Sequence, residues 1–83
     1  MEYNENMLDV ERVIKSPFAD CNAILFVEPH LKVKFRREWF SIRYYYYECE
    51  KTKERFTTET LEDFNITQLY KKYEKKHNVK LNL

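Results

Sequence analysis

The side chains best suited to covalent or metal chemistry are two cysteines and two histidines: Cys21, His30, Cys49 and His77. A zinc site usually draws on paired ligands such as C-x-x-C or H-x-x-x-H, and these four residues form no such pair. A cysteine nucleophile needs a base and an orienting group beside it. Cys49 and His30 can meet across a sheet, but neither lies in a recognisable catalytic signature. We therefore predict no enzymatic activity, no catalytic residues, no metal and no cofactor.

The composition excludes several further classes of protein. The 83-residue chain contains no glycine, so it has neither a Walker-type phosphate loop nor a dinucleotide-binding glycine turn. A chain of this length forms one small domain with a thin core, and aromatic residues, at 17%, supply much of its volume. No apolar run approaches the ~20 residues of a membrane span, and we expect no membrane partner. Two cysteines without a signal segment favour a cytoplasmic location with reduced thiols.

Basic residues concentrate in the middle of the chain. Residues 1–31 carry six acidic and two basic side chains, residues 32–55 carry eight basic and four acidic ones, and residues 56–83 carry five basic and four acidic ones. The basic middle predicts an acidic partner, either protein or phosphate. The alternative is a solvated sheet face of mixed charge.

The same middle region predicts an antiparallel hairpin. The run AILFVE (23–28) is typical of a buried strand and ends at Pro29-His30, after which residues 31–36 and 40–49 alternate apolar and polar side chains. A reversal at 36–39 places apolar side chains opposite one another on one face. The predicted pairs are Phe35–Phe40, Val33–Ile42 and Leu31–Tyr44.

The opposite face of this hairpin gathers basic and aromatic side chains. Tyr44 and Tyr46 are expected in the core, whereas Tyr45 and Tyr47 lie either beneath a helix or at a partner interface. The residues that we predict to contact a partner are Lys32, Lys34, Arg36, Trp39, Arg43 and Tyr45.

Beyond the hairpin the apolar spacing becomes helical. A short return strand is expected around 55–57, and Thr58 is a candidate helix cap. The segment Asn65-Ile66-Thr67-Gln68 has the form of a capping box, so we predict a short helix near 59–64, a break or kink, and a longer helix at 66–77. The fold class is thus α+β: a small twisted antiparallel sheet of about three strands with C-terminal helices packed on it.

Three segments describe the domain organisation. Residues 1–15 form an N-terminal arm or a short helix, residues 16–78 form a single domain, and residues 79–83 form a tail that either frays or adds an edge strand.

Three pieces of residues 16–78 also carry a family resemblance: SPFADCNAILFVE, VKFRREWFSIRYYYYECEKTKERFTT and LEDFNITQLYKKYEKKHN. Their order resembles the N-terminal YgiT-type zinc-finger domain of MqsA-like antitoxins, in particular the Bacteroidetes versions. In that family two C-x-x-C knuckles hold one zinc ion at the base of a small sheet. The resemblance aligns Ser16 and Ala19 with the first knuckle and Cys49 and Thr52 with the second, so three of the four ligands are replaced. Cys21 lies two positions beyond the first knuckle.

The resemblance implies a fold kept without its metal and a domain that neutralises a toxin by binding it. In the family a following helix-turn-helix domain binds the operator, and that activity is not carried over to this chain. We therefore expect a non-catalytic protein-binding module that covers a toxin-like partner. The alternative is a small nucleic-acid-binding regulator that uses the same basic, aromatic face. A homodimer through uncovered strand edges is a third possibility.

Overall fold

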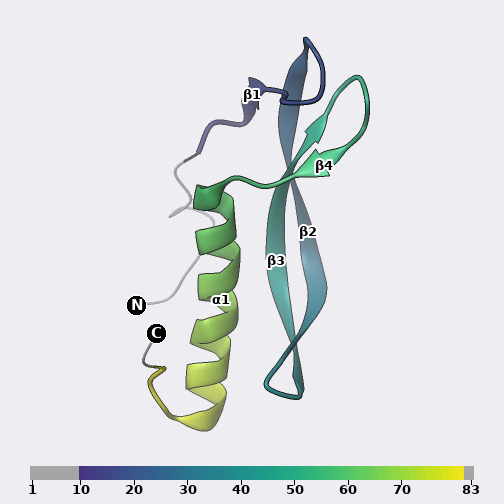
Figure 1. Cartoon of the computed structure of the whole chain (residues 1–83). Helices are drawn as coiled ribbons and strands as arrows, with labels where there is room; N and C mark the ends of the chain where they lie inside the picture. The colour runs from purple at the N-terminus through teal and green to yellow at the C-terminus, as the bar shows by residue number, and fades with distance from the viewer. Residues whose placement is uncertain (1–9, 82–83) are drawn as a thin grey trace.

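A four-stranded antiparallel sheet and one helix make up the computed structural model, which describes residues 10–81 (Figure 1). The strands lie in chain order: β1 (Val13–Lys15), β2 (Asn22–Phe35), β3 (Glu38–Cys49) and β4 (Arg55–Phe56). The helix α1 (Glu59–His77) follows β4. The predicted α+β class is confirmed, with four strands where about three were expected. Within residues 10–81, a single helix takes the place of the two that were predicted.

The β2–β3 hairpin dominates the sheet and closes in a tighter turn than predicted. Arg36 and Arg37 form a two-residue turn with φ of 50° and 69°, so Lys34 pairs with Trp39 and Val33 with Phe40. The predicted pairs, which placed Phe35 opposite Phe40, were wrong by two residues. Because side chains alternate with period two, this shift keeps the same residues on the same face.

The left-handed backbone at the two arginines of the turn lowers the free energy of unfolding by a measurable amount. A two-residue hairpin loop of this kind favours glycine at its second position, since a Cβ disfavours positive φ. We expect Arg37→Gly to raise the free energy of unfolding by about 0.5–1 kcal/mol. Chemical denaturation measures this directly. The control is Arg37→Ala, which removes the same charge without relieving the backbone and should not stabilise the protein.

Strand β2 continues through Pro29 and His30, where the sequence predicted the end of a strand. The register shifts between Glu28 and Leu31, which pair with Tyr44 and Ile42, so one extra residue of β2 is accommodated there. Such a bulge suits proline, which has no N–H to donate to the ladder. The predicted strand end at Pro29 is therefore a local irregularity inside one long strand.

Helix α1 runs antiparallel to β3 along its edge (Figure 1) and contacts both faces of the sheet. Leu61 and Phe64, in its first half, pack with Tyr45 and Tyr47. Further along, Leu69 packs in a second cluster, which buries the side chains of Phe40 and Ile42. Odd- and even-numbered residues of a regular strand point to opposite faces. The core is therefore divided into two clusters, one on each side of the sheet.

The helix is continuous from Glu59 to His77, and the predicted break at residue 65 was wrong. Thr58 is the N-cap, as predicted, and its hydroxyl accepts from the Leu61 N–H at 3.2 Å. Asn65 and Gln68 do not form a capping box. Their side chains bind the backbone of β3 instead, because the edge of that strand offers groups that no neighbouring strand pairs.

The four consecutive tyrosines divide between the faces of the sheet. Tyr45 and Tyr47 are buried beneath α1. Tyr46 is buried on the other face by ring stacking with Phe26 and Tyr44 and by the Arg55 guanidinium, which lies 4.8 Å from its ring centroid. Both faces of this part of β3 are thus covered.

The segments that flank the sheet are short. Residues 13–15 form a strand, so the alternative of a helix fails for the described part of the N-terminal arm, and residues 1–9 lie outside the described residues. Asn78 ends α1 in the left-handed conformation. Residues 79–81 add no edge strand, and the rest of the predicted tail lies outside the described residues.

Over residues 10–81, no helix is long and apolar enough to cross a membrane.

Candidate functional site

Four of the six predicted contact residues lie together on one exposed face of the hairpin. Lys32 and Lys34 of β2 lie opposite Ser41 and Trp39 of β3, and Arg43 follows on the same face. All four predicted residues are exposed. We call this set, Lys32, Lys34, Trp39 and Arg43, the basic face.

Trp39 is the central feature of the basic face. Its side chain is 64% exposed, and the Lys34 ammonium lies 5.9 Å from its ring centroid. The Arg43 guanidinium, at the other end of the face, is hydrogen-bonded through Nε to the Tyr45 hydroxyl at 3.4 Å. An exposed indole with one ammonium beside its ring and further basic side chains along the same face can bury apolar area against a partner, while the positive charges favour an acidic one.

The other two predicted residues do not belong to this surface. Arg36 lies at the turn, and its guanidinium lies 5.3 Å from the Phe35 ring and 5.2 Å from the Tyr73 ring, on the side of the helix. Tyr45 points to the predicted face but is only 5% exposed, because α1 covers that face and Phe64 meets its ring edge-on at 5.3 Å. Sequence alternation identified the face correctly and could not show where the helix covers it.

A row of polar side chains that joins α1 to the edge of β3 was not predicted from the sequence. The Asn65 amide accepts from the Tyr45 N–H and donates to the Tyr45 carbonyl, both at 2.9 Å. Gln68 binds the backbone of Arg43 in the same way, at 3.0 and 2.7 Å. Lys72 donates to the Ser41 carbonyl. We call Asn65, Gln68 and Lys72 the edge row, since they satisfy backbone groups that a neighbouring strand would otherwise pair.

The edge row leaves β2 as the more accessible edge of the sheet. Among the described residues, β1 pairs with β2 only at positions 22–24, so the remainder of β2 runs without a strand on that side. This open segment carries Lys32 and Lys34 of the basic face. The basic face and an open strand edge therefore adjoin.

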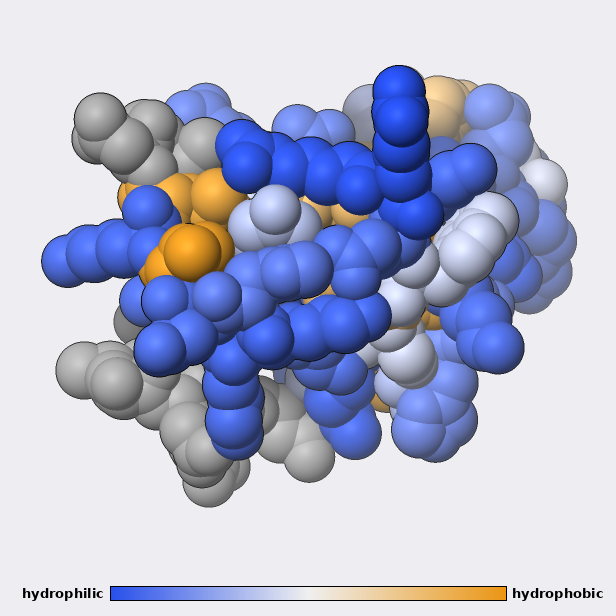
Figure 2. Space-filling model, turned by 90° about the horizontal axis from the view of Figure 1, so that it is seen from below, coloured by the Kyte–Doolittle hydropathy of each residue, from blue (hydrophilic) through white to orange (hydrophobic). Residues whose placement is uncertain are grey.

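The tip of the hairpin and the end of α1 form a charged end of the molecule. Figure 2 views the molecule from this end, and hydrophilic side chains cover most of it. Glu38 pairs with Lys76 at 2.6 Å and with His77, and the hydrogen bond from Lys76, with that from His77, lowers the pKa of the Glu38 carboxyl. These contacts fix the end of the helix against the tip of the hairpin.

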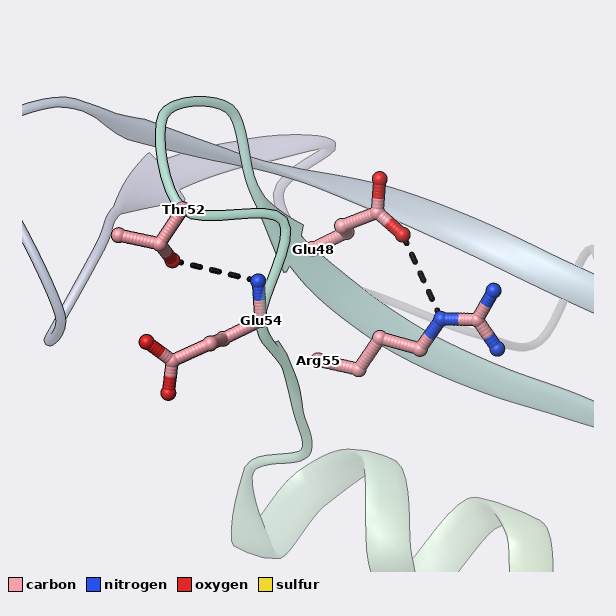
Figure 3. A network of polar contacts seen from close by, with 4 residues as sticks. All are labelled: Glu48, Thr52, Glu54 and Arg55. Carbon is pink, nitrogen blue, oxygen red and sulfur yellow. Dashed lines mark hydrogen bonds and ion pairs between the residues drawn. The ribbon is translucent and has the colours of Figure 1, made fainter.

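The two cysteines meet at the opposite end of the sheet. Their sulfur atoms lie 3.4 Å apart, with Cys21 half-buried and Cys49 fully buried. Cys49 ends β3, and the turn after it is held by the hydrogen bond from the Glu54 N–H to the Thr52 hydroxyl and by the Glu48–Arg55 ion pair (Figure 3). The Thr52 N–H donates to the Cys49 sulfur at 3.4 Å.

The surroundings of the two thiols shift their pKa values in opposite directions. Burial raises the pKa of Cys21, and its hydrogen bond to Cys49 adds to the effect. Burial also acts to raise the pKa of Cys49, but hydrogen bonds from Ser16, Thr52 and Cys21 outweigh it and lower that pKa to about 6. These hydrogen bonds therefore favour the thiolate form at Cys49 over that at Cys21.

These residues are not suited to hold the zinc ion that is bound in the family that the sequence resembles. The side chains of Ser16 and Thr52 hydrogen-bond to the Cys49 sulfur, and Ala19 offers no side-chain ligand. Structural zinc needs four ligands, mostly thiolate or imidazole. Residues 10–81 contain no group of three or more histidine, cysteine, aspartate or glutamate side chains that could hold a metal.

The possible Cys49–His30 pair is not formed. Cys49 pairs with Ala23 at one end of the hairpin, and His30 lies at the bulge. The extended strand between His30 and Ala23 spans roughly 20 Å.

Comparison with known proteins adds no relative to these observations. No protein-family model, no curated protein and no solved structure matches the chain.

Proposed function

We propose that this protein is a non-catalytic protein-binding module, similar to the toxin-neutralising domain of an antitoxin, that covers an acidic surface of a toxin-like partner in the cytoplasm. The observation that carries the proposal is Trp39, which is 64% exposed, has the Lys34 ammonium beside its ring, and lies on a part of the sheet that α1 leaves open. Tryptophan and arginine are among the residues most enriched at the energetic centres of protein interfaces. The basic charge supplies selectivity for an acidic partner.

The same surface is less suited to the alternative of single-stranded nucleic acid. Binding by base stacking uses successive exposed aromatic rings along a basic groove. Tyr45 and Tyr47, the other two aromatic residues of that face of β3, are buried beneath α1. Trp39 alone offers an exposed ring there among the described residues, which favours a protein partner.

Charge reversal on the basic face tests the proposal. We expect Lys34→Glu combined with Arg43→Glu to weaken partner binding about 100-fold or more, because each reversed charge meets an acidic partner with repulsion of ~1.4 kcal/mol or more. The partner is first captured from host lysate treated with nuclease and identified by mass spectrometry. Affinity is then measured with the purified pair at several salt concentrations.

A matched control separates the basic face from net charge. Lys51→Glu with Lys80→Glu reverses two exposed lysines away from the hairpin face, and binding should stay within a few-fold of the unmodified protein. Unchanged binding by the Lys34/Arg43 variant would show that the basic face is not the contact surface. Capture that disappears with nuclease, and binding that falls log-linearly and steeply with salt, would favour the nucleic-acid alternative.

A further inference from the structure

Two separate loops bring Cys21 and Cys49 into contact. The loop before β2 is closed by the hydrogen bond from the Ser16 N–H to the Cys21 carbonyl at 2.9 Å. The loop after β3 is closed by the bond from the Cys49 N–H to the Glu54 carbonyl, also at 2.9 Å. The Glu50 N–H donates to the Asn22 carbonyl at 3.0 Å and joins the two loops. The sulfur–sulfur contact of 3.4 Å is therefore set by backbone hydrogen bonds.

The two sulfur atoms differ in access to solvent. Cys49 has no exposed surface, whereas Cys21 is only half-buried, so Cys21 is the one of the two cysteines that a small reagent can approach from solvent. Hydrogen bonds from Ser16 and Thr52 stabilise the thiolate form of Cys49. One accessible thiol thus lies directly against one enclosed sulfur that is ready to act as a nucleophile.

We propose that Cys21 and Cys49 form a reversible dithiol–disulfide couple, in which small-molecule disulfides such as glutathione disulfide are the oxidant and Cys21 is the point of entry.

The reaction takes place in two exchange steps. Cys21 loses its proton and its sulfur attacks one sulfur of glutathione disulfide, which forms a Cys21–glutathione mixed disulfide and releases one glutathione thiolate. Cys49 loses its proton, and the resulting thiolate then attacks the Cys21 sulfur, forms the Cys21–Cys49 bond and expels the second glutathione thiolate. Two protein thiols are oxidised, one glutathione disulfide is reduced to two glutathione molecules, and the two protons end on those thiols. Excess reduced glutathione reverses both steps.

Oxidation connects the two loops covalently. The bond closes a loop that spans β2, the hairpin turn and β3, since the two cysteines are 28 positions apart. A cross-link of this kind lowers the conformational entropy of the unfolded chain. It fits the folded state, in which the two sulfur atoms are already in contact. We expect the oxidised protein to melt roughly 10 °C or more above the reduced protein.

Intact mass after equilibration in glutathione redox buffers tests the proposal on the full chain. The expected result is a monomer that loses the mass of two hydrogen atoms in oxidising buffer, recovers it in reducing buffer, and melts at higher temperature when oxidised. Two thiols that remain free in folded protein at high glutathione disulfide would overturn the proposal. A disulfide between two chains, in place of the one within a chain, would do so as well.

Two single variants test the order of the steps. Cys49→Ser should hold the mixed disulfide, so Cys21 gains one glutathionyl group and keeps it. Cys21→Ser should stay unmodified while folded, because Cys49 is enclosed. Glutathionylation of folded Cys21→Ser with none on Cys49→Ser would overturn Cys21 as the point of entry. Circular dichroism confirms that each variant is folded, and the mass test on the unmodified sequence decides the proposal if either variant is not.

Discussion

Asn65→Ala is expected to lower the free energy of unfolding by about 3 kcal/mol, because one substitution leaves two buried backbone groups of β3 without partners. The Asn65 side chain is 5% exposed and binds both the N–H and the carbonyl of Tyr45 at 2.9 Å. For a domain of this size the melting temperature should fall by roughly 15 °C. Urea denaturation and calorimetry measure both quantities.

Two further variants identify the cause of that loss. Asn65→Asp keeps the shape and the acceptor but cannot donate to the Tyr45 carbonyl, so we expect it to be about as destabilising as alanine. Gln68→Ala removes an analogous pair of bonds at a site that is only half-buried, where water can replace them, and should cost about 1 kcal/mol. Similar, small losses for Asn65→Ala and Gln68→Ala would contradict the role assigned to the buried amide.

The second large effect is expected in the divided core. Leu61→Ala removes a fully buried side chain from the cluster around Tyr45 and Tyr47 and should cost about 3 kcal/mol. Leu69→Ala should cost a similar amount in the cluster around Ile42. Because the two clusters lie on opposite faces of the sheet, substitutions in different clusters should act independently.

Double-mutant cycles with Ile42→Val test this independence, because this mild substitution keeps the total loss of unfolding free energy small. Leu61→Ala with Ile42→Val combines different clusters, and the two losses should add to within about 0.5 kcal/mol. Leu69→Ala with Ile42→Val combines neighbours in one cluster, and its coupling should exceed that value. Equal coupling in the two cycles would show that the core behaves as a single cluster.

The apolar pattern was sufficient to predict the hairpin and its faces, but not its pairing. Alternation over residues 31–35 and from Phe40 onward determines which side chains share a face. The exact register depends on the turn, and Arg36-Arg37 has none of the glycine or asparagine that would mark a two-residue turn. The bulge at Pro29 was predicted as a strand end for a similar reason, since proline commonly interrupts a strand.

The helix was located correctly and divided wrongly, because one sequence pattern has two physical explanations. Asn65 followed by Gln68 matches the residues of a capping box, in which side chains satisfy the backbone of a helix start. Here the same side-chain amides belong to the interior of a helix, and they hydrogen-bond to the backbone of a neighbouring strand. Sequence spacing alone cannot distinguish the two, because the acceptor and donor groups on β3 come from residues 20 to 25 positions away.

The alternation of side chains in the sequence correctly placed those candidate-site residues that belong to regular strand. Lys32, Lys34, Trp39 and Arg43 fall on one face because they belong to regular strand. Arg36 belongs to the turn, where left-handed backbone redirects the side chain. The burial of Tyr45 depends on where α1 crosses the edge of β3, and this position is set by tertiary packing. The contact between Cys21 and Cys49 likewise arises from loops that sequence patterns do not position.

The edge row also closes the β3 edge of the sheet to pairing with a second chain. An uncovered strand that contains consecutive tyrosines is a template for intermolecular β-pairing, the first step toward amyloid-like aggregates. In the folded protein the backbone of Ser41, Arg43 and Tyr45 is occupied by side chains of α1. Release of α1 would expose the backbone of this strand. Docking of the helix therefore keeps the tyrosine-rich strand from offering its backbone to another chain.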